Sequence, residues 1–314
     1  METINVWDWL LWKHKKWDGA ADAEERAREL GLCPDELEEE LEKLPSDARI
    51  VSSDGPEYPD SLRDLTNPPR YIYVRGQIPP ANALAFIGTR RATRWDEELI
   101  RGFVGELVAR GHHVLSGGAF GVDIWSHQAA LQAGSPTTIV VPGGLDHMSP
   151  KRHLPEFEAA LEGGGGILSL QPLGTQPFKS LYAPRNALLA ALSSGVVVLR
   201  SGETGGTMIT VEIAKRIGRP VYALPGDPRD DTCRGCLKLV KTGAAQLIWE
   251  PAHLSAHEPS STKGSLIDLL RTTESLHTAF EQSTLEWHQF EEQVFELEIR
   301  GQIKRLGDVV KVTT

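Results

Sequence analysis

Short apolar runs that alternate with helical patterns are the feature that most constrains this chain. From Leu84 onward, six such runs are separated by segments with helical spacing of apolar residues. This alternation is typical of a parallel sheet whose strands are joined by helices. The predicted strands cover residues 83–87, 113–115, 137–141, 166–170, 195–199 and 220–224. We therefore expect an α/β fold with a doubly wound, mostly parallel sheet.

Glycine or serine follows most of the predicted strands. These residues are Gly88, Ser116 to Gly118, Gly143-Gly144, Ser201-Gly202 and Gly226. In open α/β sheets, ligands bind outside the carboxyl ends of the strands, where the next helix begins. Residues 81–252 are thus predicted to form a Rossmann-like domain with a ligand site along that edge.

Two smaller parts flank this domain. Residues 1–80 read as an acidic, tryptophan-rich helical subdomain, in which Trp7, Trp9, Trp12 and Trp17 are expected to pack. A base-stacking role for these tryptophans is less favoured, because Asp8 and Asp18 lie among them. Residues 253–263 read as a linker.

Residues 264–314 have the pattern of a winged-helix-like domain, with a helix from Leu285 to Ile299 and a hairpin turned by Gly307-Asp308. Glutamates crowd the helix that would read DNA, and phosphates would repel them. We therefore expect this domain to contact protein, through an apolar stripe that includes Phe290 and Val294, or to support dimerisation.

The net charge of −10 does not exclude a polyanion as ligand. Residues 1–60 carry 7 basic and 17 acidic side chains, whereas residues 61–259 carry 20 and 17. The predicted sheet domain is therefore mildly basic, and binding depends on where charges lie and not on their sum.

Three cysteines and no recognisable export signal agree with a cytoplasmic protein. The apolar stretch from Val6 to Trp12 is too short to span a membrane. Cys233 and Cys236 form a lone CxxC without the further ligands that a zinc site needs, so neither a metal nor a cofactor is expected.

Two motifs after predicted strands suit a phosphate. Gly88-Thr89-Arg90 combines a glycine, which lets the backbone approach an anion, with a hydroxyl and a guanidinium. Ser116-Gly117-Gly118 leaves room for an anion over the next helix, which holds Asp123 and His127. We expect His127 to be a buried structural histidine. No nucleophile, base and orienting group come together here, so no catalytic residue is predicted.

Two further motifs complete the candidate site. Phe178-Lys179 and Arg185-Asn186 precede or begin an apolar helix, and they could stack on a base and hold phosphate oxygens. A core position for Phe178 is the ordinary alternative. Gly206-Thr207 lies in a second glycine-rich turn between a strand and a helix, and the two turns would outline a cleft.

The ordered series of these motifs over roughly residues 55–250 resembles the DNA-processing protein A family (DprA, also called Smf). The series includes Gly88-Thr89-Arg90, Ser116 to Asp123, Pro184-Arg185-Asn186, Gly206 to Ala214, Pro225-Gly226 and Thr242-Gly243-Ala244. The resemblance implies a protein that binds single-stranded DNA, dimerises, and hands the strand to the recombinase RecA in natural transformation.

The chain departs from the family pattern at several places, two of which bear on phosphate contacts. Ala187 replaces an arginine, and Ser149-Pro150 replaces a tyrosine-proline pair. The adjacent Lys151 and Arg152 could supply the missing phosphate contact. Arg90 and Arg185 are expected at the same edge of the sheet.

Two other functions use a similar core. The main alternative is a nucleotide phosphoribohydrolase of the LOG type, whose signature places a glutamate three residues after Gly-Gly-x-Gly-Thr. Here that position is Thr210, and Glu212 comes two residues later. A sensor that binds a nucleotide without cleaving it would fit the same cleft.

Overall fold

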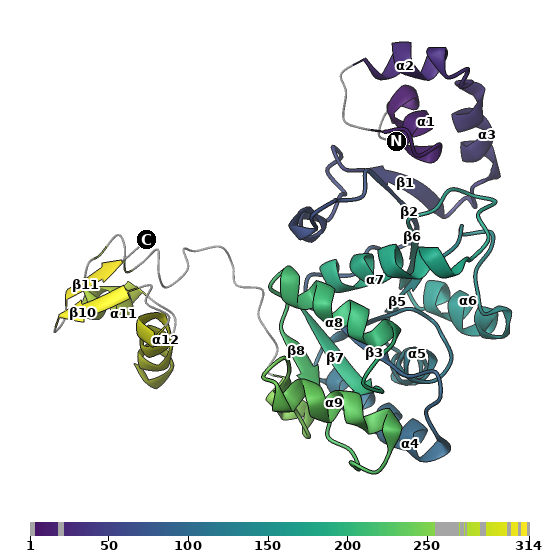
Figure 1. Ribbon diagram of the computed structural model, residues 1–314. Coiled ribbons are helices and arrows are strands. Elements are labelled where there is room, and N and C mark those ends of the chain that lie inside the picture. The colour runs from purple at the N-terminus through teal and green to yellow at the C-terminus, as the bar shows by residue number, and fades with distance from the viewer. Residues whose placement is uncertain are drawn as a thin grey trace. The chain divides into compact units, whose positions relative to one another are not determined.

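A computed structural model describes most of the chain (Figure 1). It covers residues 4–17 and 22–254, and then residues 270, 273, 275–282, 287–299, 303–306 and 309–312. The chain divides into two compact units, residues 1–257 and 258–314. Each unit is described by itself.

The first unit contains a nine-stranded sheet with the order β1-β2-β6-β5-β4-β3-β7-β8-β9. The strands from β3 onward are parallel to one another. Their bounds are β3 Ala83–Gly88, β4 His113–Ser116, β5 Thr137–Val141, β6 Gly166–Ser169, β7 Gly195–Arg200, β8 Val221–Ala223 and β9 Gln246–Leu247. The six strands predicted from the apolar runs are therefore confirmed, together with the Rossmann-like class.

Two antiparallel strands extend the sheet beyond what the sequence indicated. β1 (Ala48–Ser52) pairs with β2 (Tyr71–Gly76), and β2 pairs with β6. The segment that we expected to be helical up to residue 80 thus contributes two strands to the same sheet. The antiparallel pairing brings the end of β1 and the start of β2 to the edge that holds the carboxyl end of β6.

Helices cover both faces of the sheet (Figure 1). One face packs against α7 (Tyr182–Ala191), α8 (Gly206–Arg216) and α9 (Asp231–Lys241). The other face packs against α4 (Arg94–Ala109), α5 (Val122–Gln132) and α6 (Leu154–Glu162). Because helices cover both faces of the sheet, β5 and β7 are buried at every residue, and most of their side chains are apolar.

Local sequence fixes where the helices begin. Thr93 caps α4: its hydroxyl accepts the Asp96 N–H, and the Asp96 carboxylate accepts the Thr93 N–H in return. Short 3₁₀ helices η1 (Asp60–Asp64), η2 (Lys151–His153), η3 (Lys179–Leu181) and η4 (Pro251–His253) shape the connections. None of the described helices is long and apolar enough to cross a membrane.

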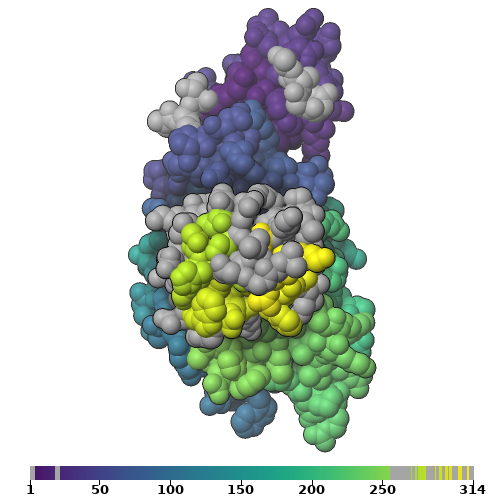
Figure 2. Space-filling view, turned by 90° about the vertical axis from the view of Figure 1, so that its left-hand side faces the viewer, coloured from purple at the N-terminus to yellow at the C-terminus, as the bar shows by residue number. Residues whose placement is uncertain are grey.

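Three N-terminal helices, α1 (Val6–Lys13), α2 (Ala23–Glu29) and α3 (Asp35–Lys43), lie at the β1 end of the sheet and are purple in Figures 1 and 2. Trp9 is fully buried, and Trp12 stacks on Tyr73 with ring centroids 6.1 Å apart. The expected packing role of the tryptophans is confirmed for these two residues.

The described part of the second unit consists of α11 (Leu276–Gln282), α12 (Trp287–Ile299) and the antiparallel pair β10 (Ile303–Leu306) and β11 (Val309–Val312). Phe290 and Val294 lie in the core of this unit. Our expectation that this stripe contacts a partner is therefore wrong, because its side chains are used within the unit. Most of the predicted linker and the predicted turn at Gly307-Asp308 lie outside the described residues, and a winged helix stays a prediction.

Candidate nucleic-acid interface

The predicted site residues come from segments that follow several strands of the parallel sheet. Gly88 ends β3 and residues 89–91 follow it, Ser116 ends β4 and residues 117–121 follow it, and α7 and α8 begin after β6 and β7. Parallel strands present their carboxyl ends at one edge of the sheet, so these segments share that edge. Contacts between their side chains join them into one site.

The loop from Gly117 to Gly121 forms the floor of this site. A Cβ on Gly117 would lie 1.8 Å from the Arg185 guanidinium, so only glycine lets the arginine pack onto the loop. Gly118 has φ +66°, and a Cβ there would meet the Phe157 ring at 2.6 Å. The glycines are therefore required for close packing of the loop against α6 and α7.

Arg90 and Arg185 meet at the ring of Tyr182. The guanidinium carbon lies 5.1 Å from the ring centroid for Arg90 and 5.6 Å for Arg185. Two cations beside one aromatic ring make a region of positive potential, and both guanidinium groups can donate hydrogen bonds to an anion. The sequence-based expectation that these arginines share an edge agrees with this geometry.

The two arginines differ in their exposure to water. Arg90 is exposed, whereas Arg185 is 6 % exposed. Burial lowers the pKa of the Arg185 guanidinium, and the charge of buried Asp123 opposes that effect. Burial likewise raises the pKa of Asp123, opposed chiefly by Arg185. Among the described residues, the Arg185 Nε has no hydrogen-bond partner.

Several predicted contact residues lie beneath the surface instead of on it. Ser116 is fully buried and donates its hydroxyl hydrogen to the Phe86 carbonyl at 2.6 Å, so it ties β4 to β3 and does not face a ligand. A Cβ on Gly88 would meet Val122 at 2.4 Å, which makes this glycine necessary for packing of α5. Asn186 is buried, and its amide lies 3.4 Å from the Gly206 carbonyl.

Other predicted residues are exposed around this floor. They are Arg90, Lys151, Arg152, Phe178, Lys179 and Gly206, while Thr89 and Thr207 are half-buried. Phe178 is 62 % exposed, so the ordinary expectation of a core phenylalanine is wrong. It directly precedes η3, which runs into α7 and hence toward Tyr182 and Arg185.

Phe120 is an aromatic side chain that the sequence reasoning did not select. It lies on the glycine loop, is 45 % exposed, and meets the His153 ring edge-on with centroids 4.5 Å apart. The His153 Nδ1 is 2.9 Å from the Gly118 carbonyl oxygen, which links η2 to the loop. The sequence did contain a signal for Phe120, because a bulky aromatic residue stands between two glycines of the loop after β4.

The remaining polar candidates have structural environments. His127 is fully buried beside the Thr137 hydroxyl, and burial lowers its pKa to about 3, so it is a neutral core histidine as expected. Cys233 and Cys236 are buried, and burial raises the pKa of Cys236 to about 12. No group of metal-binding side chains occurs among the described residues.

Known proteins resemble the sheet domain in sequence. A family model described as DNA recombination-mediator protein A matches residues 49–257. Protein Smf of Synechocystis is 31% identical over 223 residues, which are 68% of this chain and 54% of that protein. Protein Smf of Escherichia coli is 32% identical over 65% of this chain and 55% of its own length. The chain thus spans about half the length of these two relatives.

Solved structures agree with this relationship. DNA processing protein A from Streptococcus pneumoniae has a TM-score of 0.67 and 27% identity, covering 76% of this chain and 83% of its own. The Helicobacter pylori protein, whose structure is described in terms of its single-stranded DNA binding mode, has a TM-score of 0.59 and 26% identity, covering 66% and 94%. With its residues 49–257 matched by the family model, the chain belongs to the DNA recombination-mediator protein A family.

Proposed function

We propose that the first unit binds single-stranded DNA at the carboxyl edge of its parallel sheet. The observation that supports this most strongly is the joint position of Arg90 and Arg185 on the Tyr182 ring, over a loop that only glycines can form. A flexible strand can bring a phosphate to these cations while its bases meet exposed aromatic rings.

The surroundings of this cation pair suit a strand better than an isolated phosphate. Exposed Lys151, Arg152 and Lys179 extend the positive charge beyond the central pair. Exposed Phe178 and Phe120 offer flat apolar surfaces, which every base can stack on regardless of sequence. The binding mode described for the Helicobacter pylori relative supports the same ligand class.

The wider role follows from family membership. We propose that the protein protects the strand and hands it to RecA in transformation or recombination, acts as a homodimer, and works in the cytoplasm. No membrane, metal or cofactor enters this proposal. The second unit, with its acidic helix, is assigned to protein contacts instead of DNA.

Enzymatic hydrolysis of a nucleotide is disfavoured by the start of α8. Thr210, at the position of the signature glutamate, is buried, and its hydroxyl lies 3.3 Å from the Gly206 carbonyl. Glu212 is exposed and pairs with Lys215 at 3.6 Å on the helix surface. No carboxylate therefore takes the signature position, and we propose a binding protein without enzymatic activity.

Arg90 and Arg91 provide a matched test of the site. Both are exposed and adjacent, but only Arg90 has its guanidinium on the Tyr182 ring. Arg90→Ala should weaken binding to an unstructured oligothymidine by about 1–3 kcal/mol, the range for a charge-assisted hydrogen bond. Arg91→Ala should change the affinity much less. Fluorescence anisotropy with labelled single and duplex strands measures both effects.

Salt dependence adds a second criterion. If Arg90 contacts one phosphate, its removal should reduce the slope of log affinity against log salt by about 0.7. Wild-type protein should also prefer the single strand to a blunt duplex at moderate salt. Equal losses for Arg90→Ala and Arg91→Ala would contradict the site, and equal affinity for single and double strands would contradict the proposed ligand.

A further inference from the structure

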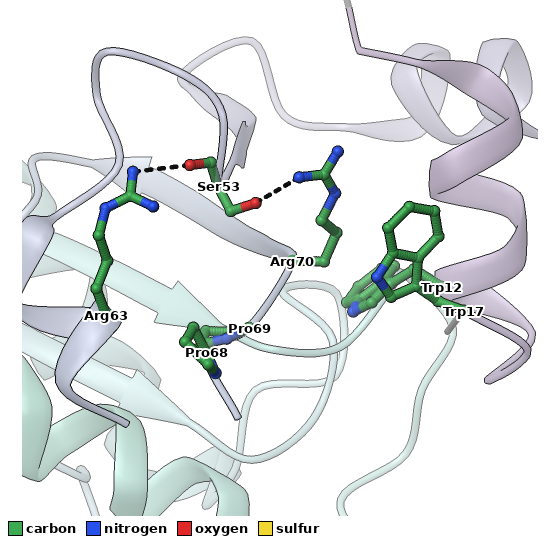
Figure 3. A pocket seen from close by; sticks show the side chains of 7 residues that line it. All are labelled: Trp12, Trp17, Ser53, Arg63, Pro68, Pro69 and Arg70. Atoms are coloured by element: carbon green, nitrogen blue, oxygen red, sulfur yellow. Dashed lines mark hydrogen bonds between the residues drawn. The ribbon is translucent and has the colours of Figure 1, made fainter. Parts of the chain in front are cut away.

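A cavity apart from the candidate interface lies at the junction of the N-terminal helices and the sheet. It has a volume of about 430 Å³, and its walls include Trp12, Trp17, Arg63, Pro68, Pro69 and Arg70. Figure 3 shows Arg63 and Arg70 reaching toward Ser53 from two sides, with the tryptophans beyond Arg70 and the prolines below. Two indoles and two proline rings give this cavity flat, apolar walls of the kind that planar ligands fill.

The cavity lies along the same edge of the sheet as the phosphate site. Ser52 at the end of β1 pairs with Tyr71 at the start of β2, and Tyr73 pairs with Ser169 at the end of β6. Ser53 and Arg70, which line the cavity, are the next residues beyond the first of these pairs. Three strand spacings, about 14 Å in all, separate β2 from β4 and its glycine loop.

The charges in the cavity favour a neutral ring over a phosphate. The Arg70 guanidinium is 2.9 Å from Asp8 and 2.5 Å from Asp54, so its charge is already balanced. It also lies 5.1 Å from the centre of the Trp17 ring and holds that wall in place. The same guanidinium offsets part of the charge of Asp8, one of the two carboxylates that had weighed against a stacking role for the tryptophans. The other, Asp18, lies outside the described residues.

Exposed cations next to the cavity walls in the sequence could serve the neighbouring phosphates instead. The turn between Trp12 and Trp17 reads Lys-His-Lys-Lys, and Lys15 and Lys16 in it are exposed. The Arg63 side chain is 54% exposed, and it lies 3.4 Å from the exposed Asp60 carboxylate, so a phosphate would share this cation with Asp60. Aromatic side chains interleaved with basic ones are the pattern of a surface that stacks bases and follows a phosphate backbone.

We propose that this cavity takes one nucleobase of the same single strand whose phosphates bind at Arg90 and Arg185. This inference rests on the proposed function and extends the path of the strand along the sheet edge, past β5 and β6 to β2. A base would stack against the Trp12 and Trp17 walls, and its flanking phosphates would lie toward Lys15, Lys16 and Arg63. In this proposal, the segment that carries the N-terminal helices is part of the DNA-binding surface.

The test uses a set of oligothymidines of equal length and charge. Each strand lacks one base, and the position of the missing base differs from strand to strand. Loss of a stacked base should weaken wild-type binding by about 5- to 150-fold at that position. Trp17→Leu should abolish the penalty at one position while leaving the salt slope unchanged, because no phosphate contact is lost. Trp249→Ala, which removes an exposed tryptophan near β9 at the other end of the sheet, should leave every penalty in place.

The outcomes separate this inference from the proposed function. If the Trp17→Leu variant still shows every abasic penalty of the wild type, the proposed base site is wrong. The cavity would then be assigned to an aromatic side chain of a protein partner. Absence of wild-type binding to any strand would instead refute the proposed function itself. Each variant is compared with itself on intact and abasic strands, so a modest loss of protein stability does not affect the result. Trp17→Phe keeps an aromatic ring and should therefore retain part of the penalty.

Discussion

Removing the charge of Arg185 should destabilise the fold strongly, because the buried charge of Asp123 would lose the largest of the interactions that offset its burial. Asp123 is 7% exposed and Arg185 is 6% exposed. The substitution Arg185→Met retains the unbranched stem and removes the guanidinium. Removal of one partner from a buried pair of charges costs about 3–5 kcal/mol, since the remaining charge stays desolvated. We expect a loss of unfolding free energy in this range at pH 8.

The loss should depend on pH in a defined direction. Burial raises the pKa of Asp123, and the charge of Arg185 opposes this rise. A carboxyl group with a raised pKa in the folded state favours folding when protonated. Its contribution is complete below the ordinary aspartate pKa and is lost as pH rises through the folded pKa. Arg185→Met enlarges the rise, so the variant should be less impaired at pH 5 than at pH 8.

Urea unfolding at both pH values measures these effects, with the wild type, the two single variants and the double variant as the four proteins compared. Asp123→Asn combined with Arg185→Met removes both charges, and it should recover most of the stability that Arg185→Met loses. The carboxamide oxygen of Asn can still accept the Ala119 N–H, which is 3.4 Å from Asp123. Equal destabilisation of the single and double variants would refute the electrostatic reasoning and indicate a loss of packing alone.

Three further predictions concern other parts of the first unit. Thr93→Ala removes the cap of α4 and should lower the unfolding free energy by about 1 kcal/mol in urea titration, whereas Thr93→Ser should retain it. Gly118→Ala places a Cβ 2.6 Å from the Phe157 ring at φ +66°, so it should lower the melting temperature and the affinity for single strands together. In thiol titration of the native protein, exposed Cys33 should react rapidly, while the two buried cysteines of α9 should react only after denaturation.

The parallel core of the fold could be predicted because its strands are short, apolar and followed by glycine. The strand predicted over residues 137–141 agrees with β5 at both ends. β1 and β2 were not predicted. They pair with each other, but their place in the large sheet depends on the pairing of β2 with β6, which lies far along the chain. Arg49 and Arg75 also interrupt the apolar pattern of these strands. In the structure Arg49 pairs with Glu57, and Arg75 pairs with Asp47.

The sequence predicted which segments meet at the candidate site better than it predicted how buried their side chains are. The sequence placed Arg185 in the right segment, but arginines are rarely buried, and only the fold brings Asp123 close enough to offset its burial. Phe178 showed the reverse, because apolar side chains are usually interior and its exposure follows from its position before η3. A pattern of residue types indicates which loops meet, whereas burial is set by residues from other elements.

The pairing of β2 with β6 also determines when β1 and β2 can join the parallel part of the sheet during synthesis on the ribosome. Tyr73 finds its partner in Ser169, almost a hundred residues later. At about 5–20 residues per second, about 5–20 s pass between the emergence of the two strands. During that interval one side of β2 has unpaired backbone N–H and C=O groups, and these groups could pair with a strand of another chain.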